Sequence, residues 1–319
     1  MITLFMGYDI IIIGSGAAGL SAAMYAGRYK MQALVIGKEF GGETATAGLI
    51  ENYPGILSID GYDLVIAMKE QAERYGAEVR EGEIVHIEKS GKGAGFVVKT
   101  KTGEQYEGAT LLFTIGSKRR HLGLEKEAEL TGKGVHYCVT CDGPLYGGKN
   151  VAMIGGGDSS VKGVNFLGAY AKKIYFITRE KEIRAEAVNF EQMQNLGSKV
   201  EILYQTEVKE LIGENKLEKV KLSKPYNGLS GQESDELVLD GLFVEIGFDP
   251  DRNLPSFLGI ELDEMGYIKV DNKMKTNILG VFAAGDGTNF FGSFKQDTTA
   301  SALGAVAATS AYEYIKANK

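Results

Sequence analysis

Cysteine is scarce in this sequence, since only Cys138 and Cys141 occur among 319 residues. Two cysteines are too few for the disulfide network that stabilises small secreted domains. Long apolar runs are missing too: residues 10–26 contain three glycines and fall short of the roughly 20 apolar residues that a transmembrane helix needs. Residues 1–7 lack the basic and apolar regions of a signal peptide. We therefore expect a cytoplasmic protein with no membrane partner.

Positive charge is not in excess either, with 35 Lys and Arg residues against 42 Asp and Glu residues. The resulting net charge of −7 disfavours the basic surface that binds nucleic acid. Proline is rare, with 5 residues, whereas the 43 glycines are about twice the usual share of ~7%. Such an excess indicates tight turns and close backbone approaches. A length of 319 residues predicts about two domains.

Residues 9–39 and 150–180 repeat one pattern. In each copy an apolar run enters a glycine cluster, a helix-length stretch follows, and a second apolar run closes the unit. This is the order of a strand–turn–helix–strand unit in a parallel sheet. Segments with strand-like alternation follow each copy, and each half ends on an apolar strand that finishes in Ile-Gly, at 111–116 and 242–247. In the second half we expect a polar loop at 224–235.

The C-terminal segment does not repeat and is too short for an ordinary domain of its own. It contains a predicted strand at 281–284 and a predicted helix at 298–316, and we interpret it as completing the first domain. The sequence therefore predicts an α/β fold with two Rossmann-like (βαβ) nucleotide-binding domains, the second inserted into the first, each with a small antiparallel β-meander. The expected boundaries are 1–116 with 247–319 for the first domain and 117–246 for the second.

Gly14, Gly16 and Gly19 form a G-x-G-x-x-G motif between a predicted strand and a predicted helix. The first glycine allows the tight turn, the second lets the backbone approach a pyrophosphate, and the third allows close packing of helix and strand. The helix N-terminus then offers free N–H groups to phosphate oxygens. Glu39, the nearest acidic residue for a ribose, lies slightly beyond the second strand.

The second glycine cluster, residues 155–160, has the same spacing, with Ser160 in the third position. The strand after it ends at Arg179 and Glu180, and Arg184 follows one turn later. Arginine here suits the 2′-phosphate of NADPH, whereas a carboxylate suits a free 2′-hydroxyl. A solvated helix face is the alternative interpretation. Two nucleotide loops without a metal motif or a P-loop lysine indicate electron transfer between a flavin and a nicotinamide.

Cys138 and Cys141 form a C-x-x-C pair just before the second glycine cluster. The pair has three interpretations: a zinc site completed by His121 and His136, two inert buried thiols, or a redox dithiol that closes into a disulfide. Zinc is disfavoured because no second cysteine pair exists. Asp142 follows directly and either moves a proton to or from a thiolate or caps a turn. We expect the three histidines to be ordinary surface residues.

Over nearly its whole length the sequence resembles the low-molecular-weight thioredoxin reductases. The motifs that carry the resemblance follow the family's order, at residues 14–19, 41–44, 51–55, 138–142, 155–160, 284–286 and 295–296. The resemblance implies a homodimer that moves electrons from NADPH through FAD and the Cys138/Cys141 dithiol to the disulfide of thioredoxin or a similar redoxin. The first domain would bind FAD and the second NADPH, in the service of cell redox homeostasis.

The resemblance also implies roles for individual residues. Cys141 would receive electrons from the flavin, Cys138 would attack the protein disulfide, and Asp142 would act as the acid. The residues expected around FAD are Gly14, Ser15, Gly16, Ala17, Gly19, Gly42, Glu43, Thr44, Asn52, Gly116, Gly285, Asp286, Lys295 and Gln296. Those expected around the nicotinamide nucleotide are Gly155, Gly157, Asp158, Ser159, Arg179 and Arg184. No metal is implied. The family rotates one domain against the other, with hinges expected at 116–120 and 240–247.

Two departures from the family pattern concern the electron donor. The usual His-Arg-Arg phosphate clamp is Thr178-Arg179-Glu180 here, and the usual acidic pair after the second glycine loop is Lys162-Gly163. NADPH remains the first expectation, with NADH, ferredoxin or a deazaflavin as alternative donors. A flavin-dependent dithiol oxidase and a nucleotide-binding redox sensor without turnover are the alternative functions.

Overall fold

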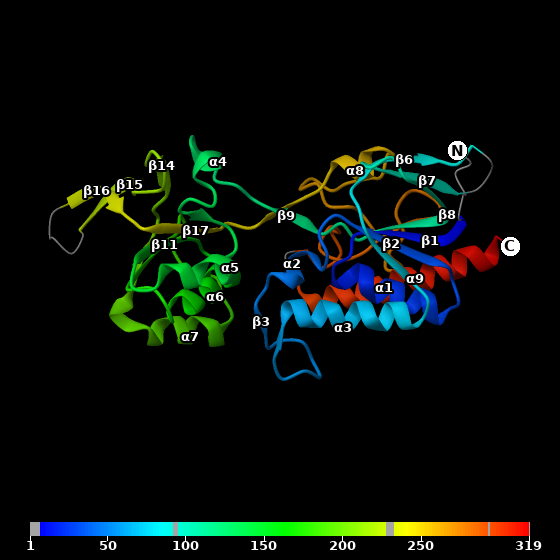
Figure 1. Ribbon diagram of the computed structural model, residues 1–319, viewed down its shortest axis with the longest axis horizontal. Coiled ribbons are helices and arrows are strands. Elements are labelled where there is room, and N and C mark those ends of the chain that lie inside the picture. The colour runs from blue at the N-terminus through cyan, green and yellow to red at the C-terminus, as the bar shows by residue number, and fades with distance from the viewer. Residues whose placement is uncertain (1–6, 92–94, 228–232, 293, 319) are drawn as a thin grey trace. The chain divides into compact units, whose positions relative to one another are not determined.

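A computed structural model of the protein describes residues 7–91, 95–227, 233–292 and 294–318. The chain divides into two compact units: unit 1 comprises Met1–Lys118 and Asp249–Lys319, and unit 2 comprises Arg119–Phe248. Unit 1 is thus made from both ends of the chain, with unit 2 inserted between them in the sequence (Figure 1). Residues 1–6, which carry most of the expectation that a signal peptide is absent, lie outside the described residues.

Unit 1 is built on a seven-stranded sheet in the order β5-β2-β1-β8-β7-β6, with β19 beside β8. Five strands pair in parallel: β1 (Gly7–Ile13), β2 (Ala33–Gly37), β5 (Glu78–Glu81), β8 (Gln105–Phe113) and β19 (Val281–Ala283). Two continue the sheet in antiparallel: β6 (Ile84–Lys89) and β7 (Phe96–Thr100). The run of isoleucines in β1 is uninterrupted because both faces of this central strand are buried.

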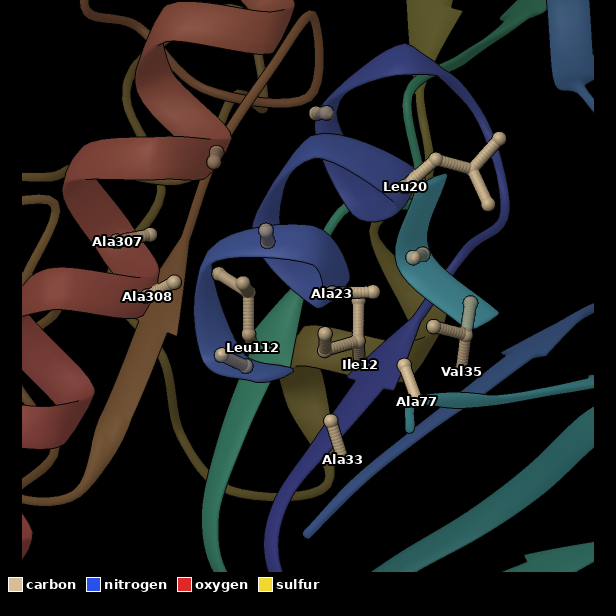
Figure 2. Packing of buried hydrophobic residues seen from close by; sticks show 14 of the residues in the cluster. Ile12, Leu20, Ala23, Ala33, Val35, Ala77, Leu112, Ala307 and Ala308 are labelled. Carbon is tan, nitrogen blue, oxygen red and sulfur yellow. The ribbon is translucent and has the colours of Figure 1, made fainter. Parts of the chain in front are cut away.

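The helices α1 (Ala17–Arg28), α3 (Gly61–Arg74) and α9 (Asp297–Ala317) pack into one core of unit 1 with Ile10 and Ile12 of β1. Figure 2 shows Ala23 of α1 beside Ile12 of β1, with Ala307 and Ala308 of α9 beside α1. Ile11 and Ile13 point to the opposite face and pack into a second core with residues of β6, β7 and β8. The C-terminal helix is therefore part of the first core.

Unit 2 contains a five-stranded parallel sheet in the order β10-β17-β11-β12-β13. Its strands are β10 (Val135–His136), β11 (Asn150–Gly155), β12 (Lys173–Ile177), β13 (Val200–Leu203) and β17 (Gly241–Glu245). The helices α6 (Asp158–Leu167) and α7 (Ala187–Asn195) contribute to its core on one face. A separate antiparallel sheet contains β14 (Val208–Ile212), β15 (Lys219–Asn227) and β16 (Glu233–Val238).

Short elements complete both units. In unit 1 they are α2 (Gly42–Ala45), β3 (Leu49–Ile50), β4 (Ile59–Asp60) and α8 (Asn253–Ser256). In unit 2 they are α4 (Glu127–Leu130), α5 (Val139–Asp142) and the 3₁₀ turns η1 (Gly143–Tyr146) and η2 (Gly197–Lys199). The two segments of chain that join the units form the short strands β9 (Ser117–Arg119) and β18 (Phe248–Pro250), which pair with each other.

The predicted fold class is confirmed, including the repeated strand–helix–strand units and the inserted second half. The loop expected at 224–235 is wrong at both ends, because 224–227 belong to β15 and 233–235 to β16, while 228–232 lie outside the described residues. These strand ends are largely exposed, so their sequence carries no apolar alternation. Within the described ranges, no helix has the length and apolar character to cross a bilayer.

The close contact between α1 and α9 yields a stability prediction. A Cβ at Gly304 of α9 would overlap the carbonyl oxygen of Ala18 in α1. We expect Gly304→Ala to lower the free energy of unfolding by about 1–3 kcal/mol, because overpacking outweighs the gain in helix propensity. Chemical denaturation measures this. Gly147→Ala is the matched control, since no atom lies within 4 Å of its added Cβ, and a change of equal size there would contradict the prediction.

Candidate functional site

The two cysteines lie on a single turn of helix in unit 2. Cys138 occupies the N-cap of α5 and Cys141 lies inside it, and their sulfurs are joined as a disulfide. The backbone N–H of Cys141 donates to Cys138 Sγ at 3.3 Å. Cys138 is half-buried, whereas Cys141 is exposed. The spacing of two residues between the cysteines therefore places the sulfurs within bonding distance, as the redox interpretation requires.

His136 joins Asp142 to a buried tyrosine beside this turn. Its Nδ1 lies 3.0 Å from Asp142 Oδ2, and its Nε2 lies 2.6 Å from the hydroxyl of Tyr146. The expectation of a surface histidine is wrong here, since His136 is only 5% exposed and stacks on Phe243 of β17. Burial raises the pKa of Tyr146 to about 12, and the charges of Asp142 and Asp240 add to the rise.

The contacts of Asp142 and His121 do not support the alternative roles, which are a turn cap for Asp142 and a zinc ligand for His121. Asp142 makes no side-chain capping bond, and its carboxylate pairs with His136 instead. His121, the other candidate zinc ligand, is exposed and contacts Tyr137 and Glu127. The pairing of His136 with Asp142 gave no clear sequence signal, because the two residues flank the cysteine pair without a recognised spacing.

In unit 1 the first glycine loop joins β1 to α1. A Cβ at Gly14, where φ is 117°, would overlap the carbonyl oxygen of Thr114, and a Cβ at Gly19 would overlap that of Gly14. These two glycines are therefore needed for packing. A Cβ at Gly16 would meet only Gly41 O, at 3.7 Å, so the backbone there is accessible. The first turn of α1 holds no acidic residue, which leaves its N–H groups and positive dipole for an anion.

Residues from distant parts of unit 1 gather around this loop. Gly42 lies beside Gly16, and a Cβ there would be 3.7 Å from Gly16 Cα. Thr44 donates to Asp297 Oδ1 at 2.6 Å, which ties α2 to the first turn of α9. Asn52 donates to Gln296 Oε1 at 2.9 Å at the N-cap of the same helix. The expected flavin residues of α2, residue 52 and α9 are thus brought together.

Asp286 and Lys295 supply the charged groups of this region. Burial raises the pKa of Asp286 to about 6; Lys295 opposes the rise, and Asp297 and Glu43 add to it. Among the described residues, no side chain or backbone group hydrogen-bonds to the Asp286 carboxylate. Lys295 donates to the carbonyl of Thr288 at 2.7 Å, and burial lowers its pKa.

In unit 2 the second glycine loop joins β11 to α6. A Cβ at Gly155 would lie 2.6 Å from Glu245 O, so close packing requires this glycine, whereas a Cβ at Gly157 would meet only Arg184 O, at 3.9 Å. Asp158 in the first turn of α6 is already engaged. Its carboxylate accepts hydrogen bonds from the backbone N–H of Glu186 and the side chain of Asn189, and it pairs with Lys162 at 3.3 Å.

A single carboxylate lies between the two arginines expected at the adenosine end of this loop. Glu180 is 3.5 Å from Arg179 Nε and 3.1 Å from Arg184 Nη2. Both arginines are more than 70% exposed, so each pair is weak on its own. The exposed charges agree with a solvated face, and they also leave both guanidinium groups reachable for a phosphate.

Comparison with known proteins covers almost the whole chain. The family described as pyridine nucleotide-disulphide oxidoreductase matches residues 8–308. A thioredoxin reductase of Peptoclostridium acidaminophilum is 37% identical over 318 residues, covering 98% of each chain. The crystal structure of Lactococcus lactis thioredoxin reductase in its FR conformation matches with a TM-score of 0.88 and 33% identity, covering 97% of this chain and 99% of that one. The T. acidophilum thioredoxin reductase structure matches with a TM-score of 0.86 and 35% identity, covering 96% and 98%.

The isolated carboxylate of Asp286 yields a pH prediction. Its folded pKa of about 6 lies above that of the unfolded chain, so the fold loses stability as pH rises from about 4 to 6. We expect Asp286→Asn to stabilise the flavin-free protein by about 2–3 kcal/mol at pH 7.5 and by only about a third as much at pH 4.5. Chemical denaturation at both pH values measures the difference. The control is Glu264→Gln, an exposed carboxylate of the same unit, and an equal gain at both pH values in Asp286→Asn contradicts the prediction.

Proposed function

The chain belongs to the pyridine nucleotide-disulphide oxidoreductases and, among them, to the thioredoxin reductase family, and we propose that it moves electrons from NADPH through FAD and the Cys138/Cys141 dithiol to the disulfide of thioredoxin or a similar redoxin. It is an oxidoreductase. The observation that carries the proposal is the disulfide on the single turn of α5, directly followed by a carboxylate that is paired with a histidine. We further propose that the enzyme is a cytoplasmic homodimer that serves cell redox homeostasis.

FAD is proposed to bind unit 1. Three features support this: the accessible backbone at Gly16 and Gly42, the first turn of α1 without an acid, and the Asp286 carboxylate, to which no described residue donates a hydrogen bond. A ribitol hydroxyl would supply the hydrogen-bond donor that no described residue offers to the Asp286 carboxylate. When bound, the flavin supplies a carrier that accepts and releases electron pairs. The proposed contacts are Gly14, Ser15, Gly16, Ala17, Gly19, Gly42, Glu43, Thr44, Asn52, Gly116, Gly285, Asp286, Lys295 and Gln296.

The nicotinamide nucleotide is proposed to bind unit 2. The open backbone at Gly157 and the N-terminus of α6 suit a pyrophosphate. Arg179 and Arg184 would hold the 2′-phosphate of NADPH. The other proposed contacts are Gly155, Gly157, Asp158 and Ser159. Gly116 and Gly247, both at positive φ in the joining segments, are the proposed hinge residues.

NADH is a second candidate donor, favoured by Glu180. This carboxylate pairs with both arginines, and it would repel a 2′-phosphate while accepting a hydrogen bond from a free 2′-hydroxyl. The oxidase alternative and the donors ferredoxin and deazaflavin find no specific support among the contacts of the described residues. Glu180 is therefore the side chain that favours NADH, and Arg179 and Arg184 are those that favour NADPH.

An anaerobic titration of the purified holoenzyme tests the proposal. NADPH or NADH should bleach the flavin absorption band, and oxidised thioredoxin should restore it. In Cys138→Ser, bleaching should persist while reduction of thioredoxin falls at least about 100-fold, because the attacking sulfur is gone. The bound-flavin spectrum serves as the control for folding. Unchanged thioredoxin reduction by Cys138→Ser contradicts the assignment, and rapid peroxide formation from a small dithiol would select an oxidase instead.

The role of Glu180 is tested separately. Glu180→Gln removes the charge that faces the proposed 2′-phosphate position but keeps the side-chain shape. We expect the ratio of kcat/KM for NADPH to that for NADH to rise about fivefold, as for loss of a repulsion of about 1 kcal/mol in an exposed site. Glu182→Gln is the control, because this neighbouring carboxylate is exposed and its removal changes the net charge by the same amount. If Glu182→Gln raises the ratio of kcat/KM values by the same factor, net charge and not the position of Glu180 sets the preference, and the prediction is contradicted.

A further inference from the structure

A short segment after β12 lies against the second glycine loop as a neighbouring strand would. The backbone N–H of Arg184 donates to the carbonyl of Gly156 at 2.8 Å, and Arg184 forms a parallel bridge with Gly157. This segment, residues 184–186, carries one of the two guanidinium groups proposed to hold a 2′-phosphate. The contacts that hold the segment on the loop therefore also fix the backbone from which the Arg184 side chain extends.

The chain that leads into this segment is fixed at its other end as well. The backbone N–H of Gln205 donates to the carbonyl of Glu180 at 3.1 Å. The backbone N–H of Thr206 donates to the carbonyl of Thr178 at 2.9 Å, directly after β12. Residues 180–186 therefore form a strap, with one end fixed beside the sheet and the other end fixed on the glycine loop.

Asp158, in the first turn of α6, supplies side-chain contacts at the glycine-loop end of the strap. Its Oδ1 accepts hydrogen bonds from the backbone N–H of Glu186 and from Asn189 Nδ2, both at 2.9 Å. Its Oδ2 lies 3.3 Å from Lys162 Nζ. Asn189 is itself buried, and its carbonyl accepts a hydrogen bond from Asn165 Nδ2 at 2.9 Å. Both oxygens of the Asp158 carboxylate are thus engaged by protein groups from α6, the strap and α7.

A carboxylate is an unfavourable group beside a proposed phosphate site. The N-terminus of a helix attracts anions, so a negative side chain in its first turn competes with a pyrophosphate for the same N–H groups. The first turn of α1 carries no such group. In α6 the ammonium of Lys162 offsets the charge of Asp158, and two donors occupy its Oδ1. The presence of this carboxylate is therefore explained by what it holds, which is the strap.

We propose that the side chain of Asp158 positions the adenosine end of the nicotinamide nucleotide site: it holds the strap on the glycine loop, and the strap places Arg184 for the 2′-phosphate. This inference rests on the proposed function. Hydrogen bonds to an ionised acceptor are stronger than those between neutral groups, which suits a carboxylate to this task. The contact proposed above for Asp158 is made by its backbone N–H at the open end of α6, while its side chain acts through the strap.

The first test needs no nucleotide, so its outcome does not depend on the proposed electron donor. Hydrogen exchange of the flavin-bound enzyme is followed by mass spectrometry in peptides that span the strap. Asp158→Ala should speed exchange there about tenfold, because the amide of Glu186 loses its acceptor. Lys162→Met is the control: it removes the ion pair, leaves both hydrogen bonds and should not change the exchange of the strap. Equal exchange of the strap in Asp158→Ala and the wild type overturns the proposal.

The second test measures binding of adenosine 2′,5′-bisphosphate, which carries the 2′-phosphate of NADPH without the nicotinamide, by calorimetry. Asp158→Ala should weaken binding about tenfold, and Asp158→Asn, whose amide oxygen can still accept both hydrogen bonds, should recover most of that loss. If the Asp158 charge acted mainly by repelling phosphate, both variants would bind more tightly than the wild type, and the proposal would be overturned. No binding to the wild type contradicts NADPH as the donor, whereas the exchange test still decides the role of Asp158.

A third variant tests the same contact from the α7 side. Asn189→Asp replaces the donor with a second acceptor that faces Asp158 Oδ1, and it should speed exchange of the strap and weaken binding as Asp158→Ala does. The double variant should lose little more than either single variant, because each breaks the same contact. Unchanged exchange in β11 and β12 shows that unit 2 is folded in each variant. Losses that add in the double variant overturn the proposal.

Discussion

The close approach of a glycine turn to the end of the neighbouring parallel strand is the constraint on which both units depend. In unit 1 Gly14 lies against Thr114 after β8, and in unit 2 Gly155 lies against Glu245 at the end of β17. A side chain at either glycine would push the turn away from the sheet. The following helix would then lose its place over the strands, and with it the N–H groups that face a phosphate. The repeat in the sequence is thus a repeat of one packing requirement.

The two loops share this geometry and differ in charge. The first turn of α1 carries no acidic residue, whereas α6 begins with Asp158. That carboxylate is directed to the backbone and side chain of the α7 region and to Lys162. Glu180 adds a second acid near the end of β12. Equal backbones can therefore favour different nucleotides, because the side chains around them set the local charge.

How much of the fold and of the site could be predicted from the sequence depends on whether a feature is visible within a short stretch of chain. The glycine loops and the cysteine pair each occupy a short stretch of sequence, and their spacing alone indicated turn, helix and dithiol. The pairing of His136 with Asp142 depends instead on β10, α5 and β17 packing together, with Phe243 under the ring. No periodicity encodes such a contact. The strand ends of β15 and β16 were missed for a related reason, because pairing between backbones holds them and exposed polar side chains cover them.

The use of both ends of the chain in unit 1 has a consequence for synthesis on the ribosome. Unit 2 is contiguous, and its synthesis is complete at Phe248. In unit 1, by contrast, β8 must wait for its neighbour β19 and α1 for its partner α9, both of which are made near the end of translation. The inserted unit can therefore fold while the first unit still exposes the apolar face of α1. Translation orders the two folding events, and the interval between them is when the nascent chain is most open to aggregation or to chaperones.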